Sequence, residues 1–340
     1  MKKFAIILLF IIIPICNGFS QTSNIIINKA SHFELILEND TIDFIVLNSN
    51  LSEKKPILLY CQSENPIPLF INYNNSEIFM YAGGIINFDY KSIAENYYIV
   101  VISKPKISLI SEPTEIFNND TEIINYFKRN NQNSDFLNSE SLENNTNRAL
   151  YVLKFLSSQK WVDNTNLVVV GYSQGAEIAT NIAIKNNKVT KLGLLNPIPY
   201  GKIGLAIRQI RQEANKKIIS WEEADKKISE LTEFYSLSLD PIVIKKSLGI
   251  VSWGSFSTPL IEEWTKLNIP IFLGYGINDF SAEFCDLAPL YFIRINKNNL
   301  TAKRYINMGH NFCNIDTNGN EDINFIHWNE VMADFCQWLQ

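Results

Sequence analysis

The sequence predicts an α/β fold in which a mostly parallel central sheet carries helices on both faces. Short, fully apolar runs recur along the chain, as in PILLYC (56–61) and LVVV (167–170). Stretches with helical periodicity separate several of these runs. The chain has 340 residues, 46% hydrophobic and 19% charged, so a core large enough to cover both faces of a sheet can form.

The strands of this sheet are expected at the apolar runs. The β-like runs NIIIN, FELILE and DFIVLN come first and suit an antiparallel edge. A helix is expected in NRALYVLKFLSSQ, where Ala149, Leu153 and Leu156 follow at spacings of four and three. The C-terminal segment INFIHWNEVMADFCQWL is expected to form one amphipathic helix that contains His327. The expected parallel strands are PILLYC, YIVVIS, LVVV, KLGLLN, IPIFLGYG and KRYINMG.

One helical segment, at about 200–255, interrupts the alternation of strands and helices. In SWEEADKKISELTEFYSL, Ser220 and Glu223 have the spacing of a capping box. We interpret the segment as a helical cap insertion in a single domain that spans 21–340. The alternative is a helical elaboration with no role in binding. Three tryptophans in or near it are expected to pack rather than to line an acyl pocket: Trp221, Trp253 and Trp264.

The first residues have the pattern of a secretory signal peptide at 1–20. Two lysines precede an apolar run at 4–15, and small or polar residues lead to a predicted cut before Gln21. The protein is therefore expected to be exported, to a periplasm or out of the cell. A lipid anchor on Cys16 is disfavoured because bulky Ile15 precedes it. No later segment is apolar for the roughly 20 residues of a membrane span.

Charge and cysteine usage limit the partners of the chain. The formal net charge is -5 and no lysine or arginine run occurs, so no nucleic-acid partner is expected.

Without Cys16, four cysteines allow three full pairings. Cys61 lies in an apolar strand and suits a buried thiol, while a bridge among Cys285, Cys313 and Cys336 stays possible.

No metal or cofactor is expected from the sequence. No histidine and cysteine cluster has zinc spacing, and no glycine loop suits a phosphate. The stretch DTNGNEDINF (316–325) alternates polar residues like a calcium loop. However, Glu321 stands where such a loop needs glycine, and His327 where it needs an acid. A polar loop is therefore expected there.

The turn at Ser173 is the strongest chemical signal in the chain. Gly171, Tyr172, Ser173, Gln174 and Gly175 fit the pattern G-x-S-x-G, after a strand and before the helical run QGAEIATNIAIK. Such a turn exposes the serine hydroxyl above a sheet, and glycines make room where strand and helix nearly touch. The alternative is a tight turn with a purely structural role.

The run VVVGYSQGA resembles the nucleophile elbow of the α/β-hydrolase superfamily. The resemblance extends from about residue 40 to the end and implies an α/β-hydrolase fold, with the helical insertion at the usual cap position. It also implies a catalytic serine, then an acid, then a histidine along the chain.

The acid that this order requires is expected at Asp279. It directly follows the strand IPIFLGYG, in the run GINDF. There it would orient the histidine and stabilise its charged form. Asp286 and Glu283 are alternatives, but Asp286 falls in the following helical stretch.

The base that this order requires is expected at His310, where the strand KRYINMGH gives way to a loop. It would take the proton of Ser173 and return it to the leaving group. The chain has two other histidines. His32 precedes the core sheet, and His327 is expected to pack.

The oxyanion hole needs two backbone N–H groups. Gln174 should supply one, because it directly follows the nucleophile. The other is expected from Gln62 or Ser63, in the loop after PILLYC. Members of the superfamily often have glycines in this loop, and QSENP has none.

The resemblance therefore implies a serine hydrolase acting on a small-molecule or peptide acyl substrate, with a carboxylic ester expected. The same residues would serve an exopeptidase or an amidase, because the triad does not choose the leaving group. A hydrolase fold kept only for binding is the alternative of another class. Specificity is expected to come from the insertion and from the segment 103–144.

Overall fold

The structure is a computed structural model. It describes residues 20–21, 25–27, 30–48, 50–73, 77–112, 120–240, 243, 249–317 and 319–340. Apart from Ser20, the predicted signal peptide lies outside the described residues, as does Cys16. Within these ranges, no helix has the length and apolar character needed to cross a membrane.

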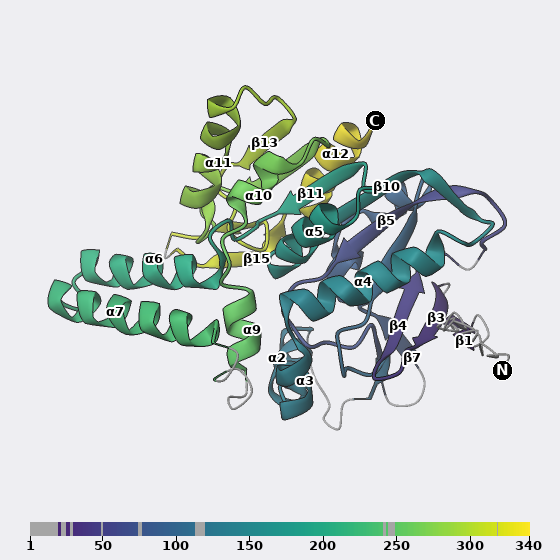
Figure 1. Ribbon diagram of the computed structural model, residues 1–340, viewed down its shortest axis with the longest axis horizontal. Coiled ribbons are helices and arrows are strands. Elements are labelled where there is room, and N and C mark those ends of the chain that lie inside the picture. Colours follow the sequence, from purple (N-terminus) through teal and green to yellow (C-terminus); the bar gives the residue numbers. More distant parts are fainter. Residues whose placement is uncertain are drawn as a thin grey trace, which may run out of the picture.

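A ten-stranded sheet forms the centre of the molecule (Figure 1). Its strands are β1 Ser20–Gln21, β2 Ile25–Ile27, β3 Ala30–Ile36, β4 Thr41–Val46, β5 Lys55–Cys61, β8 Tyr98–Ile102, β10 Val162–Tyr172, β11 Lys191–Leu195, β12 Ile271–Gly276 and β13 Leu300–Tyr305. The order is β1-β3-β4-β8-β5-β10-β11-β12-β13, with β2 beside β3. Neighbours from β8 to β13 are parallel, whereas β1 to β4 form an antiparallel edge. The predicted fold class is confirmed.

Helices cover both faces of this sheet. Val169 of β10 packs in one apolar cluster, and its neighbours Val168 and Val170 pack in the other. Successive strand residues point to opposite faces, which explains why the strand is apolar throughout. Figure 1 shows α4 and α5 on the near face. The helices are η1 Ala82–Asn87 (3-10), α1 Tyr90–Ala94, α2 Asp120–Asn131, α3 Ser134–Ser139, α4 Leu142–Leu156, α5 Gln174–Lys185, α10 Ile261–Lys266, α11 Ala282–Arg294 and α12 Trp328–Leu339.

The C-terminal segment differs from its prediction. INFIHWNEVMADFCQWL is not one helix: β15 (Glu321–Ile326) forms a hairpin with β14 (Cys313–Ile315), and the helix α12 begins only at Trp328. The reason is the pairing of β15 with β14, which helical periodicity does not reveal. A further small sheet contains β6 Phe70–Tyr73, β7 Glu77–Met80 and β9 Ile110–Ser111.

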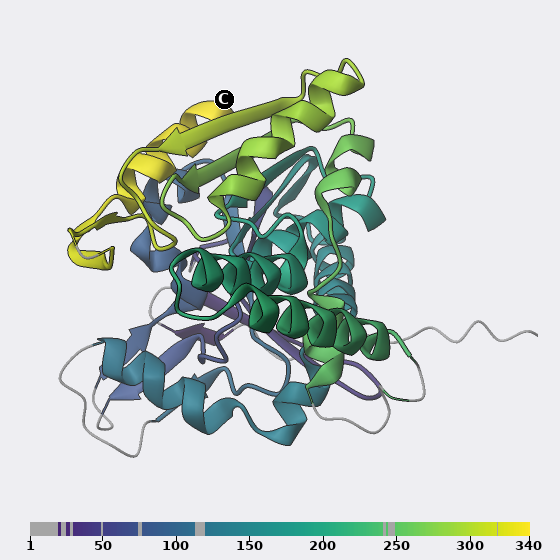
Figure 2. The same cartoon turned by 90° about the vertical axis from the view of Figure 1, so that its left-hand side faces the viewer.

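The helical insertion forms an arm that projects from the body. It contains α6 (Gly201–Asn215), α7 (Trp221–Ser238) and α9 (Ile250–Ser255), within the predicted range. The hairpin of α6 and α7 extends to the left in Figure 1 and points toward the viewer in Figure 2. At the start of α7, the Ser220 hydroxyl oxygen accepts the Glu223 N–H at 3.1 Å, one half of the predicted capping box.

The four cysteines of the described chain are free thiols, so the bridge that the sequence left open among the last three is not formed. Cys61, Cys285 and Cys313 are buried, and Cys336 is partly buried. Burial raises the pKa of the Cys61 thiol to about 12, which suits the inert buried thiol expected from its strand.

Candidate active site

The turn at Ser173 is fixed by backbone contacts that only glycine permits. A Cβ on Gly171 would lie 2.0 Å from the Gly175 carbonyl oxygen, and one on Gly175 would lie 2.0 Å from that of Cys61. Ser173 itself has φ 53 and ψ -128, a conformation that costs about 1–3 kcal/mol and persists only where its surroundings enforce it. The strand and the helix therefore hold this serine in a strained turn.

Ser173 lies in a hydrogen-bonded row with a histidine and a buried aspartate. The Ser173 Oγ is 2.9 Å from His310 Nε2, and His310 Nδ1 is 2.5 Å from Asp279 Oδ2. When Nδ1 carries the ring proton, it donates to Asp279 and leaves Nε2 to accept the serine hydroxyl. Asp279 is 2% exposed, and its other oxygen accepts the Ser281 N–H at 2.6 Å.

The sheet topology explains how distant residues meet. β10, β11 and β12 are neighbouring parallel strands. Ser173 follows the carboxyl end of β10 and Asp279 follows that of β12, so both lie at the same edge of the sheet. His310 comes from the loop after the next strand, β13. This strand ends at Tyr305 and not at His310 as expected, because Asn307 has a left-handed φ of 60. The loop then turns back over the edge, with His310 beside Ser173.

The other candidate acids and histidines lie elsewhere and have other partners. None of them is within the row formed by Ser173, His310 and Asp279. Asp286 bonds to Tyr275 and Arg304, Glu283 to Arg208, His32 to Asp43 and His327 to Asn314.

A cavity of about 290 Å³ opens above Ser173 and His310. Aromatic side chains form much of its wall, which also includes amides, the acid Glu64 and the cation Lys128 of α2. Lys128 comes from the segment 103–144, which was expected to contribute to specificity. None of α6, α7 and α9 supplies a lining residue to this cavity. Besides Ser173, His310 and Lys128, the lining consists of Tyr60, Ser63, Glu64, Asn65, Tyr81, Gly83, Gly84, Asn87, Phe88, Tyr172, Asn311 and Trp328.

The three tryptophans in or near the insertion do not line this cavity. Trp221 is 48% exposed, with the Arg211 guanidinium 5.2 Å from its ring centre. Trp253 packs against the rings of α7, and Trp264 is buried in the core. Trp253 and Trp264 therefore pack as expected, whereas Trp221 is largely exposed.

The two candidates for the second oxyanion donor differ in position. Ser63 lines the cavity beside Ser173, whereas Gln62 does not. The side-chain amide of Gln62 donates to the Ile102 carbonyl oxygen at 2.6 Å, a contact that does not involve the backbone N–H. Gln174 begins α5, so its N–H belongs to the first turn, where N–H groups have no partner within the helix. Ser63 therefore suits the second donor better than Gln62.

The sequence interpretation missed the glycines that approach this loop. Gly83 and Gly84 of η1 have φ values of 65 and 90 and line the cavity. A Cβ on Gly83 would lie 2.7 Å from the Gln62 Cβ. Gly83 therefore lies so close to the loop after β5 that no side chain fits between them. The adjacent glycines at 83–84 were the available signal.

A buried ion pair supports the residue after the nucleophile. Lys104 and Glu140 are both nearly inaccessible, and their Nζ and Oε1 atoms lie 2.7 Å apart. The same Glu140 oxygen accepts the Gln174 side-chain amide at 2.9 Å. Buried charges are tolerated only when paired in this way. The pair therefore fixes the side chain of Gln174, beside the predicted oxyanion donor.

Glu177, one turn further along α5, is a buried acid of another kind. Neither carboxylate oxygen has a hydrogen-bond partner within the described chain. Burial raises the pKa of Glu177 well above its usual value. A buried carboxyl group without a hydrogen-bond partner therefore lies in the helix that follows the nucleophile.

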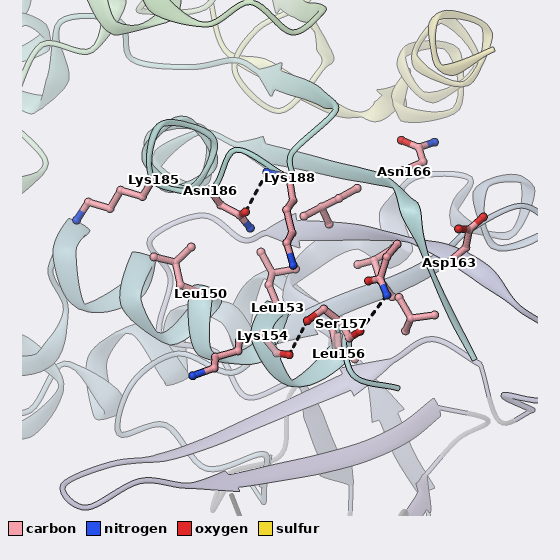
Figure 3. Close-up of a pocket in the computed structure, with 14 residues that line it drawn as sticks. Leu150, Leu153, Lys154, Leu156, Ser157, Asp163, Asn166, Lys185, Asn186 and Lys188 are labelled. Carbon is pink, nitrogen blue, oxygen red and sulfur yellow. Dashed lines mark hydrogen bonds between the residues drawn. The ribbon is translucent and has the colours of Figure 1, made fainter. Parts of the chain in front are cut away.

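A second cavity, of about 240 Å³, lies away from the triad (Figure 3). Leucines of α4 form its apolar side, and Lys154, Lys185 and Lys188 lie around it. No histidine lines it. In the described ranges, no group of three or more histidine, cysteine, aspartate or glutamate side chains could hold a metal ion. Of these two cavities, only the one at Ser173 is lined by a serine and a histidine that are hydrogen-bonded to each other.

The strand order, the strained serine turn and the order serine, aspartate, histidine define an α/β-hydrolase fold. Solved structures with this likeness include acetyl xylan esterase 1 from Thermoanaerobacterium sp., which is 14% identical. The match covers 86% of this chain and 82% of that one, with a TM-score of 0.45.

Two further solved structures are similar at the same level. Naproxen esterase from Bacillus subtilis is 14% identical, with 92% of each chain covered and a TM-score of 0.46. The uncomplexed acylaminoacyl peptidase of Pyrococcus horikoshii is 12% identical, with a TM-score of 0.48. The match covers 91% of this chain but only 41% of that peptidase. No protein-family model and no curated protein sequence matches the chain. At identities this low, the likeness is one of fold.

Proposed function

We propose that the protein is an exported serine hydrolase that cleaves a carboxylic ester through an acyl-enzyme. The observation that carries the proposal is the hydrogen-bonded row from Ser173 Oγ to His310 Nε2 at 2.9 Å and from His310 Nδ1 to Asp279 Oδ2 at 2.5 Å. Export is supported by the signal-peptide pattern at 1–20.

The first half of the reaction forms the acyl-enzyme. Ser173 Oγ attacks the ester carbonyl carbon while His310 Nε2 takes the hydroxyl proton. Asp279 stabilises the resulting imidazolium through Nδ1. His310 then gives the proton to the departing alkoxide, and the alcohol leaves.

The second half releases the acid. His310 removes a proton from water as the water oxygen attacks the acyl carbon, and Ser173 leaves with that proton. The tetrahedral oxyanion of each half would be held by the N–H groups of Gln174 and Ser63. The aromatic walls of the cavity suit an apolar or planar substrate of modest size, since the cavity measures about 290 Å³.

A fluorophosphonate probe tests the nucleophile directly. Protein lacking residues 1–20 is compared with Ser173→Ala and with Ser31→Ala. Ser31 is also fully buried, but it lies on β3, in the antiparallel part of the sheet. Labelling is expected in the parent and in Ser31→Ala and should be absent from Ser173→Ala. Hydrolysis of p-nitrophenyl esters should fall about a thousandfold or more in Ser173→Ala.

Two results would contradict the proposal. A well-folded parent protein that is neither labelled nor active on esters of any chain length would favour a fold kept for binding. Labelling with activity on amino-acid amides but not on esters would retain the serine hydrolase and replace the ester by a peptide or amide.

A further inference from the structure

Asn196 lies in the middle of the sheet edge at which the strands leading to Ser173 and Asp279 end. It directly follows β11, the strand between the one that leads to Ser173 and the one that leads to Asp279. It is fully buried, with 0% of its surface exposed. Its φ is 43, a left-handed conformation that is uncommon outside glycine but tolerated by asparagine. The site thus contains a buried side-chain amide, on a left-handed backbone, that the reaction steps do not use.

The polar groups of Asn196 reach the loops of both other catalytic residues. Its Oδ1 accepts the N–H of Gly276 at 2.9 Å, three residues before Asp279. Its Nδ2 donates to the His310 carbonyl oxygen at 2.6 Å. One residue earlier, the Leu195 carbonyl accepts the Ser173 N–H at 2.9 Å. The junction of β11 with its loop therefore contacts the nucleophile, acid and base segments together.

A second donor meets the same histidine carbonyl. The Tyr172 hydroxyl lies 2.9 Å from the His310 oxygen and 2.9 Å from Asn311 Oδ1. The loops of the acid and the base also bond to one another, from the Asn278 N–H to the Met308 carbonyl at 3.0 Å. What Asn196 adds is a link from both loops to the central strands, which hold Ser173.

We propose that Asn196 is a positioning residue that sets the acid and base loops in register with the nucleophile. The inference rests on the proposed serine hydrolase function. Asn196 does not line the cavity, so it acts through the His310 carbonyl and the Gly276 N–H rather than on substrate. Small displacements of catalytic groups are costly: about 1 Å reduces rates on the order of 100-fold. The donated hydrogen bond to His310 is therefore expected to affect turnover more than substrate binding.

Two substitutions remove that donor in different ways. Asn196→Asp keeps the shape and the acceptor for Gly276 but replaces the donor by an oxygen. Asn196→Gly removes the side chain and relaxes the left-handed backbone, so at least one variant should remain folded. Asn166→Asp is the control, since the Asn166 amide is half-buried, is hydrogen-bonded to Tyr97 and Thr190, and lies far along β10 from Ser173.

The expected result is a fall of about 10- to 100-fold in kcat for p-nitrophenyl acetate in both Asn196 variants. Rates are normalised to protein that binds the fluorophosphonate. KM should change less than threefold, and Asn166→Asp should match the parent. An independent readout is the far-downfield proton resonance expected of the short bond between His310 Nδ1 and Asp279. It should shift or broaden in the Asn196 variants and stay in place in the control.

Unchanged kcat and an unmoved resonance in folded Asn196→Gly would overturn the inference. A loss of melting temperature alone, with normal kcat per labelled site, would also overturn it and leave Asn196 a merely structural residue. If the parent hydrolyses no ester, the proposed function fails separately. The resonance then still decides whether Asn196 sets the position of His310.

Discussion

The serine turn and the helical arm differ in how closely their surroundings constrain them. At the turn, a single added carbon on Gly171 or Gly175 would collide with backbone. In the arm, Ala224 and Ser238 are the buried residues of the whole helix α7. Gly249, just before α9, has open space around its missing Cβ.

Tight backbone contacts mark the places in the molecule where function can reside. Backbone contacts that tolerate no extra atom can hold a hydroxyl in a strained conformation, and strain of this kind concentrates at functional sites. The exposed positions of α7 and the turn at Gly249 meet no such contact, and the arm adds no residue to the Ser173 cavity. Substitutions that cost much at the turn should cost little at these positions.

The largest effect is expected from Gly171→Ala. Its Cβ would meet the Gly175 carbonyl oxygen at 2.0 Å, and neither backbone can yield without breaking the turn. We expect loss of folded, probe-labelled protein, measured by circular dichroism and fluorophosphonate labelling. Gly249→Ala is the control, with a cost near 1–2 kcal/mol from its left-handed φ of 75 alone. Equal stability of the two variants would remove the contrast between turn and arm.

The next largest effect is expected from Asp279→Asn. The substitution keeps the size of the side chain but favours the wrong tautomer of His310, and in a serine protease the equivalent change lowers kcat about 10⁴-fold. We expect a loss of that order in ester hydrolysis with the melting curve little changed. Asp286→Asn provides the comparison, since that carboxylate pairs with Arg304 and Tyr275. A similar loss in both variants would argue against Asp279 as the acid.

The residues that meet at the carboxyl ends of the parallel strands could be predicted, because local sequence signals and the sheet topology agree there. The apolar runs identified the parallel strands, and the glycines around Ser173 identified the sharp turn. Parallel strands end at one edge, so residues directly after them, such as Asp279, were expected to meet. The prediction that His310 joins them required only that the chain return to the same edge of the sheet after its last strand.

Features that depend on pairing between distant segments could not be predicted. The hairpin strand at 321–326 was taken for helix because its partner strand, 313–315, has no signal of its own. Gly83 approaches Gln62 through the fold of η1, which spacing along the chain does not reveal. Asn196 looks like an ordinary turn residue in sequence, and its bonds arise only from the neighbouring strands.

A moderate effect that varies with pH is expected from Glu177→Gln. Burial raises the pKa of Glu177 in the folded protein, whereas the unfolded chain releases the proton near the ordinary value of 4.5. The free energy of unfolding of the parent should therefore fall as pH rises above that value, by up to about 1.4 kcal/mol per pH unit, until the folded pKa is passed.

The glutamine variant lacks this dependence, because its side chain stays neutral. Its advantage over the parent should be near zero at pH 4 and should grow toward pH 7, as followed by urea unfolding at each pH. Glu230→Gln, on the exposed face of α7, serves as the control and should show no such growth. Parallel stability curves for Glu177→Gln and the parent would mean that Glu177 is ionised in the fold.

The smallest effect is expected from Trp221→Ala at the start of α7. The ring is 48% exposed and contacts the Arg211 guanidinium, and exposed cation–π contacts contribute about 0.5–1 kcal/mol. Ester hydrolysis should be unchanged, because the residue is absent from the cavity lining. Trp264→Ala is the counterpart in the body, where the ring is 2% exposed and its Nε1 donates to Thr180 at 2.9 Å. That change should cost about 3–5 kcal/mol. If instead Trp221→Ala raised KM severalfold for long-chain esters while Trp264→Ala did not, the arm would take part in substrate binding and the contrast with the turn would fail.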